Sequence, residues 1–139
     1  MHDEIAIQQT INRYSVAASQ GDWDAVIATF TPDGVWEVPV HKVRFVGPEE
    51  IRSGLIRFSS PMDYIVQLNS PSVITVDGDA ATAECVIREG GKLSGADAAL
   101  EIMGRYKDRL VRTPQGWRFA LRLFELAGMH SFPLQPAAS

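Results

Sequence analysis

Hydrophobic positions in the first part of the chain recur with the period of an α-helix. Within residues 3–20, the apolar side chains spaced i, i+4, i+7 and i+11 are Ile7, Ile11, Tyr14 and Ala18. This spacing predicts an amphipathic helix with one buried face. Asp3 suits the start of such a helix and Gly21 its end. The pattern therefore places a phenol, Tyr14, on the face that should point inward.

Two further helices are expected before residue 60. Asp22 can cap a short helix. The apolar side chains expected on one face of that helix are Trp23, Val26, Ile27 and Phe30. The sequence TPDG at 31–34 is typical of a turn. Residues 47–58 predict a third helix, because Pro48 suits its first position and two glutamates follow in its first turn.

The pattern then changes to the period of a β-strand. Residues 35–40 alternate, and Pro39 marks either an edge strand or a strand end. After Pro61, further strands are expected at 63–68, 72–76, 80–88, 99–113 and 116–127. The polar, glycine-rich residues 89–98 predict a mobile loop. Residues 131–139 predict a tail that lies on the surface or is disordered.

Three helices followed by a run of antiparallel strands predict an α+β fold, in which the helices pack on one face of a curved sheet. We expect one domain over residues 1–130, followed by the tail 131–139. So long a sheet in a chain of 139 residues should curl. A curled sheet closed by helices leaves a cone with an open mouth, which is a common place for a small-molecule cavity.

Charge and cysteine content limit the kinds of partner and cross-link that this chain can have. The formal net charge of −4 argues against nucleic acid or an anionic membrane, since either requires a basic surface. Cys85 is the single cysteine and lies in an apolar run, so we expect a core residue and no internal disulfide. The N-terminus lacks an apolar signal core and no run reaches the length of a membrane span. These features favour a cytoplasmic location.

Four stretches of the chain resemble the NTF2-like superfamily, in particular its SnoaL-like branch. The N-terminal half is represented by INRYSVAASQGDWDAVIATFTPDGVWEVP and FVGPEEIRSGL, and the β half by VDGDAATAECVI and GRYKDRLVRTPQGWRFALRLFEL. The resemblance implies a cystatin-like cone with three N-terminal helices on a strongly curved antiparallel sheet. This superfamily includes ketosteroid isomerases, scytalone-type dehydratases, polyketide cyclases, a dehydrochlorinase and many non-catalytic binders, so the fold selects no single reaction.

The ketosteroid isomerases of this superfamily use a tyrosine on the first helix, and Tyr14 matches it. Asp108 matches their second oxyanion-hole acid. Their aspartate base stands just before a proline on the first strand, where this sequence has Val38. The neighbouring Glu37 points to the opposite face of a regular strand. The resemblance thus implies part of an oxyanion hole without the base that these isomerases need.

Scytalone-type dehydratases and the dehydrochlorinase pair an aspartate near the end of the first helix with a histidine on a middle strand. The matching positions here are Ser19 and either Val66 or Gln67, so both members of the pair are absent. Ser19 and Gln67 cannot act as bases near neutral pH, and we expect them to contact a ligand instead. Arg122 matches an arginine that the dehydrochlorinase places in its cavity to receive an anion.

The remaining polar candidates each allow two interpretations. Alternation over residues 104–112 places Tyr106 and Asp108 on one strand face, where they either hydrogen-bond a ligand or form structure, with Asp108 in an ion pair with an arginine. Tyr14 is either a cavity hydroxyl or a core aromatic bonded to backbone. Trp36 suits the wall of a cavity for a flat apolar ligand. His41 is the best histidine for acid–base work, unless it is simply exposed.

Two functions follow as hypotheses. The first is an enzyme without cofactor or metal that isomerises, cyclises or dehydrates a hydrophobic oxygenated molecule of the polyketide, terpenoid or aromatic type. In it Tyr14 and Asp108 polarise a substrate oxygen, and His41, Glu37 or Asp33 is the base. The second is a non-catalytic small-molecule binder or assembly protein. No pair of histidines has metal-ligand spacing, so a metal site is not expected.

In either case we expect a homodimer formed through the outer face of the sheet. Regular alternation of the last strand places Phe124 and Leu126 on that face, near Arg118 and Arg122. A β-bulge in this strand would reverse the alternation and turn Arg122 inward.

Overall fold

The computed structural model describes residues 2–135 of the chain. Its elements, in chain order, are α1 (His2–Gln20), α2 (Trp23–Ile27), β1 (Phe30–Val38), the 3₁₀ turn η1 (Pro39–His41), β2 (Val43–Val46), α3 (Gly47–Ser59), β3 (Met62–Asn69), β4 (Val73–Asp77), β5 (Ala80–Leu93), β6 (Ala98–Thr113) and β7 (Gly116–Pro133). Within these residues, no helix combines the length and the apolar character needed to cross a membrane.

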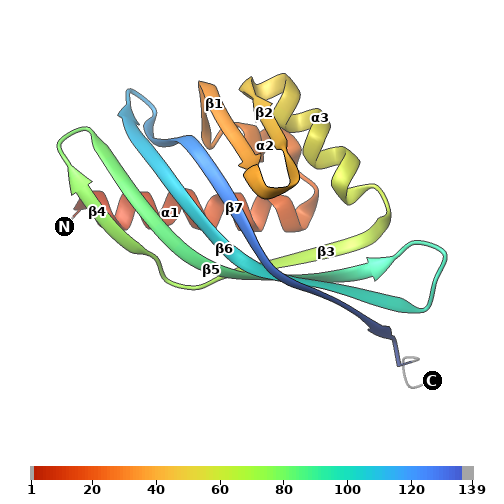
Figure 1. Ribbon diagram of the computed structural model, residues 1–139. Helices are drawn as coiled ribbons and strands as arrows, with labels where there is room; N and C mark the ends of the chain where they lie inside the picture. The colour runs from red at the N-terminus through yellow and green to blue at the C-terminus, as the bar shows by residue number, and fades with distance from the viewer. Residues whose placement is uncertain (1, 136–139) are drawn as a thin grey trace.

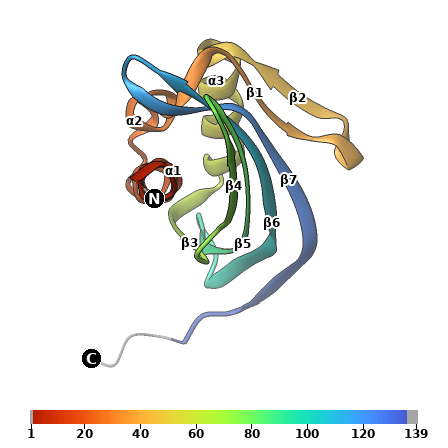
Figure 2. The ribbon, with the colours of Figure 1, turned by 90° about the vertical axis from the view of Figure 1, so that its left-hand side faces the viewer.

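The strands form one strongly curved sheet in the order β2-β1-β7-β6-β5-β3, with β4 also paired to β5. All pairs are antiparallel except β1 with β7, which run parallel. Figure 1 shows α1 lying across the concave face of the long strands, and Figure 2 shows the sheet curling around that helix. The predicted α+β cone is therefore confirmed, with one parallel pair that the sequence did not indicate.

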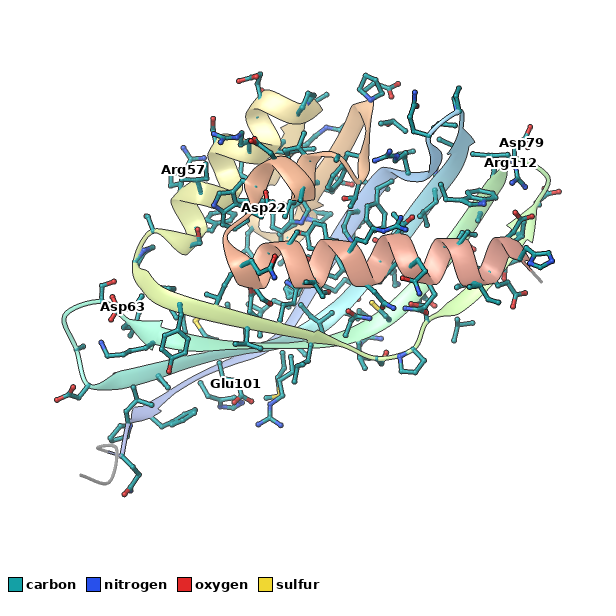
Figure 3. The ribbon with its side chains drawn as sticks, turned by 180° about the vertical axis from the view of Figure 1, so that it is seen from behind. Asp22, Arg57, Asp63, Asp79, Glu101 and Arg112 are labelled. Atoms are coloured by element: carbon teal, nitrogen blue, oxygen red, sulfur yellow. The ribbon has the colours of Figure 1, made fainter. Side chains whose placement is uncertain are left out.

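The core lies between α1 and the sheet, as the periodicity predicts. The four apolar positions expected to face inward from α1 are all buried: Ile7, Ile11, Tyr14 and Ala18. On β5 every second residue points inward, and the buried ones are Ala81, Ala83, Cys85 and Ile87. Asp22 caps α2 by accepting a hydrogen bond from the Ala25 backbone N–H at 3.2 Å, as expected (Figure 3).

Two predicted irregular segments belong to the sheet. Residues 31–34, expected as a turn, lie within β1, where the pairing with β7 changes register between Phe30 and Val35. Residues 89–98, expected as a loop, mostly continue β5 and β6, and only 94–97 form the connection. Gly91 explains the second error, because its missing side chain lets the Tyr64 carbonyl of β3 approach β5. The tail is shorter than expected, since β7 continues to Pro133; residues 136–139 lie outside the described part.

Strand β7 contains a bulge that reverses its alternation. Arg109 of β6 pairs with Leu121, whereas Leu110 pairs with Phe119, so Ala120 has no partner. Phe119 and Arg122, which regular alternation would place on opposite faces, are consequently both buried inside. The alternative with Arg122 inward is confirmed. The outward placement of Phe124 and Leu126 is wrong, because both line the interior cavity described below.

Replacing Gly91 with alanine should lower the free energy of unfolding by about 1–3 kcal/mol, the usual cost of overpacking. A Cβ at this position would overlap the backbone oxygen of Tyr64. Gly90→Ala is the matched control, because the nearest atom to a Cβ there would be the Leu100 carbonyl oxygen at 3.8 Å. Urea unfolding followed by tryptophan fluorescence measures both variants. Equal stabilities would contradict this account of β5.

Candidate ligand cavity

A cavity of about 610 Å³ lies inside the curved sheet, and residues of α1, α3 and η1 line its other sides. Most of its wall is aliphatic or aromatic. The polar or titratable side chains among its lining residues include Tyr14, Trp36, His41, Ser59, Gln67, Glu89 and Tyr106. An apolar hollow with a few convergent polar groups is the usual form of a small-molecule site.

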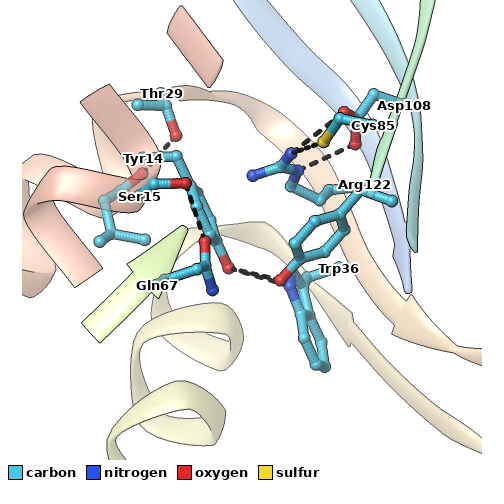
Figure 4. Close-up of polar contacts among 10 residues, drawn as sticks. Tyr14, Ser15, Thr29, Trp36, Gln67, Cys85, Asp108 and Arg122 are labelled. Carbon is cyan, nitrogen blue, oxygen red and sulfur yellow. Dashed lines mark hydrogen bonds and ion pairs between the residues drawn. The ribbon is translucent and has the colours of Figure 1, made fainter. Parts of the chain in front are cut away.

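A hydrogen-bonded group of three aromatic side chains forms one wall. The Trp36 indole N–H donates to the Tyr14 hydroxyl at 3.1 Å, and the Tyr14 and Tyr106 hydroxyl oxygens lie 3.3 Å apart (Figure 4). These three groups carry three donor hydrogens, and the two contacts use two of them. One tyrosine hydrogen is thus left over. Because both tyrosines line the cavity, that hydrogen is available to a ligand oxygen.

Arg122 lies behind the tyrosine pair and is fully buried. Its guanidinium carbon is 4.4 Å from the centre of the Tyr14 ring and 3.7 Å from that of Tyr106. Asp108 holds it with two contacts, Nε to Oδ1 at 2.9 Å and Nη2 to Oδ2 at 3.2 Å (Figure 4). Burial disfavours the charged guanidinium, but the Asp108 carboxylate outweighs this and raises the pKa of Arg122. The cation and its counter-ion therefore act as a fixed charged platform under the tyrosines.

Burial also determines the protonation of the two tyrosines. It raises the pKa of Tyr14 and raises that of Tyr106 well above its ordinary value, although the nearby Arg122 cation opposes both shifts. Both hydroxyls consequently keep their protons at neutral pH. They can act there as hydrogen-bond donors and cannot act as bases.

A second polar network enters the cavity from α1 and β3. The Ser19 hydroxyl donates to the Ser15 carbonyl at 2.8 Å and accepts from the Gln67 backbone N–H at 2.8 Å. The Ser15 hydroxyl donates to Gln67 Oε1 at 3.0 Å (Figure 4). Both bonds to Gln67 come from α1, so this helix fixes its backbone and its amide group together.

Glu89 is the cavity residue that sequence reasoning missed. It is partly buried, lines the cavity and is the cross-strand partner of Gln67. Burial raises the pKa of its carboxyl, and a hydrogen bond from the Gln67 side chain opposes that shift. The signal was present in the alternation of β5, because Ile87 points inward and residue 89 continues the same face. The two glycines that follow Glu89 are typical of a loop, so the sequence pattern did not place Glu89 on the strand.

The structure brings together five of the expected site residues and separates three. Those that line the cavity are Tyr14, Trp36, His41, Gln67 and Tyr106. His41 is exposed and stands on η1 at the mouth. Ser19, Asp108 and Arg122 lie behind the wall, where they hold Gln67 and the tyrosines in place.

The other two expected bases take part in contacts of their own. Glu37 accepts a hydrogen bond from Arg44 at 3.3 Å, and Asp33 accepts one from Thr31 at 2.9 Å.

A second hollow of about 740 Å³ lies along the other side of α1, against α2 and the turn between β6 and β7. Across residues 2–135, no cluster of three or more potential metal ligands occurs. The inner cavity is therefore the candidate site.

Fold and cavity together define an α+β cone built around a largely apolar cavity. The family model of the SnoaL-like domain matches residues 1–122, and the chain belongs to this family. No curated protein matches the chain.

Similar solved structures share the fold over nearly their whole length. A candidate aromatic ring hydroxylase from Novosphingobium aromaticivorans is 24% identical with a TM-score of 0.85, over 94% of each chain. A candidate scytalone dehydratase from the same organism is 17% identical with a TM-score of 0.84, over 100% of this chain and 99% of that one. A hexachlorocyclohexane dehydrochlorinase, LinA type 2, is 14% identical with a TM-score of 0.84, over 96% and 94%. The expected NTF2-like, cystatin-like fold is thereby confirmed.

Replacing Asp108 with asparagine should lower the free energy of unfolding by about 3–5 kcal/mol, since it leaves the buried Arg122 cation without its counter-ion. The matched control is Glu125→Gln, which breaks an exposed contact with Lys107 and should cost less than about 1 kcal/mol. Urea unfolding at neutral pH measures both changes. An Asp108→Asn protein as stable as the parent would show that the pair does not support the fold.

Proposed function

We propose that this protein binds a hydrophobic, oxygenated small molecule in the inner cavity and transforms it by proton transfer, as a cofactor-independent isomerase, cyclase or dehydratase. The single observation that carries the proposal is the spare tyrosine hydrogen at the wall of a largely apolar cavity. In such a setting a hydrogen bond is directed and strong, because little water competes for it. Structures named as a dehydratase and a dehydrochlorinase share the fold and support this class.

The charge of the lining favours an uncharged ligand. Among the described residues that line the cavity, the titratable side chains other than tyrosine are Glu89 and His41, and none is lysine or arginine. A carboxylate or phosphate ligand would meet the Glu89 carboxylate rather than a cation. Arg122 is covered by the tyrosine rings, which does not favour the anion-binding role implied by the resemblance.

A non-catalytic binder is the second candidate. It is favoured by Ser19 and Gln67, which stand at the positions where the dehydratases and the dehydrochlorinase carry their acid–base pair. Ser19 uses its hydroxyl to hold Gln67, and Gln67 uses its oxygen to accept from Ser15. A cavity can be shaped for binding alone, so turnover decides between the two candidates.

The double variant Tyr14→Phe/Tyr106→Phe removes both hydroxyl hydrogens and should weaken binding of a neutral ketone by about five- to tenfold, the equivalent of one net hydrogen bond of about 1–1.4 kcal/mol. Tyr106→Phe alone should bind the ketone nearly as the parent does, because it leaves the Tyr14 hydrogen free to donate. The probe is 6-propionyl-2-(dimethylamino)naphthalene, whose emission reports binding. The control ligand is 2-ethylnaphthalene, which has no oxygen and should bind both variants as it binds the parent. Equal losses for both ligands would mean that the tyrosines only shape the wall, and would argue against the proposal.

The expected homodimer and cytoplasmic location stay predictions. The outer face of the sheet does carry exposed apolar side chains from β3 and β5, and these are Tyr64, Val66, Leu68 and Val86. Phe124 and Leu126, which were expected to contribute to that interface, line the cavity instead.

A further inference from the structure

Glu89 is a carboxylate that the fold holds in place without neutralising it. Its strand β5 lies between β3 and β6, and its cross-strand partners are Gln67 on one side and Ile102 on the other. Among the described residues, no lysine, arginine or histidine makes an ion pair with it within 4.0 Å. A partly buried carboxylate without a cationic partner costs stability, so its presence on a cavity wall needs a reason beyond packing.

The amide of Gln67 orients this carboxylate. Gln67 Oε1 accepts from the Ser15 hydroxyl at 3.0 Å, which leaves the amide hydrogens for the Glu89 side chain. The Gln67 backbone is in turn held by Ser19 at 2.8 Å. Two serines of α1 therefore hold in place the residue that lies opposite Glu89 on the neighbouring strand.

Glu89 shares the cavity lining with other titratable or polar side chains. They are Gln67 from β3, Tyr14 from α1, Tyr106 from β6 and His41 from η1. The negative charge of Glu89 contributes to the raised pKa of both tyrosines, which places the carboxylate within electrostatic reach of their hydroxyls. Burial raises the pKa of Glu89, which makes its carboxylate a stronger base than an exposed one.

We propose that Glu89 is the acid–base residue of this cavity and that Gln67 is its positioning residue. This inference rests on the proposed function, which supplies a ligand oxygen bound at the tyrosine pair. For a ketone, the Glu89 carboxylate takes a proton from the carbon next to the carbonyl. The electron pair of that C–H bond becomes the C=C bond of an enolate, whose oxygen carries the negative charge and accepts a hydrogen bond from a tyrosine. Protonated Glu89 exchanges its proton with solvent and returns a proton to carbon, which restores the ketone and the carboxylate.

The test uses 2-tetralone, a neutral ketone with acidic α-hydrogens, in D₂O. Mass spectrometry follows the uptake of deuterium at the α-carbon, and the ketone probe above follows binding. The parent protein should accelerate exchange over buffer, and Glu89→Gln should lose about 100-fold or more of that acceleration while still binding the probe. Glu84→Gln is the matched control on the outward face of the same strand and should exchange as the parent does.

The pH dependence of deuterium exchange tests the positioning role of Gln67, because a purely structural role of Gln67 would leave that dependence unchanged. Only the ionised carboxylate accepts a proton, so exchange should rise with pH through the raised pKa of Glu89. Gln67→Met removes the hydrogen bond that lowers this pKa, so the rise should move to higher pH. An unmoved profile in Gln67→Met would overturn the positioning role.

Stability provides a measurement that needs no ligand. Below the pKa of an ordinary glutamate, Glu89 is protonated in the folded and unfolded states, and Glu89→Gln should unfold like the parent. As pH rises, the unfolded chain ionises first, and the parent loses stability until it passes the raised pKa of the folded state. Glu89→Gln should therefore be the more stable protein at pH 8, and equal stability at both pH values would contradict a desolvated Glu89.

The outcomes separate the two proposals. Exchange by Glu89→Gln at the rate of the parent overturns the role of Glu89 and leaves the proposed function standing. Binding of the probe without any acceleration by the parent overturns proton transfer at Glu89 and supports the non-catalytic binder. Absence of probe binding in the parent overturns the proposed function, and this inference with it.

Discussion

A cation buried in the centre of the molecule organises the structure. Arg122 is fully excluded from solvent, and the fold compensates it with the Asp108 carboxylate and with the faces of three aromatic rings, those of Tyr14, Tyr106 and Phe119. Removing a guanidinium from water is costly, so each of these contacts has to form when the chain folds. Because the rings come from α1, β6 and β7, the same requirement fixes the helix against the sheet and sets the position of both cavity hydroxyls.

A single unpaired residue makes this arrangement possible. The bulge at Ala120 lets Phe119 and Arg122 share the inner face of β7, so that the aromatic ring and the cation that it covers come from one strand. The bulge also aims Phe124 into the cavity rather than outward. A local change of alternation thus links the charged core to the apolar wall of the site.

The parts of this structure that follow a simple period could be predicted from the sequence. The stripe from Ile7 to Ala18 and the inward residues of β5 up to Ile87 appear where their spacing places them, because burial of one face is the dominant stabilising effect. Prediction failed where glycine or a bulge changes the rule. Gly91 permits a close contact across strands that resembles a loop in the sequence, and no local signal marks the unpaired Ala120. The residues hidden by these two features, Glu89 and Phe124, belong to the site.

Arg122 and Glu89, two charged residues of the inner face, differ in a way that separates structure from function. Arg122 has a counter-ion, a double contact and three covering rings, and the cavity lining does not include it. Glu89 has one neutral hydrogen-bond partner and faces the hollow. A charge that serves the fold is paired, because pairing offsets most of the cost of desolvation. A charge that must gain and lose a proton needs the opposite, an environment in which both protonation states are close in free energy, and an amide partner without a formal charge provides it.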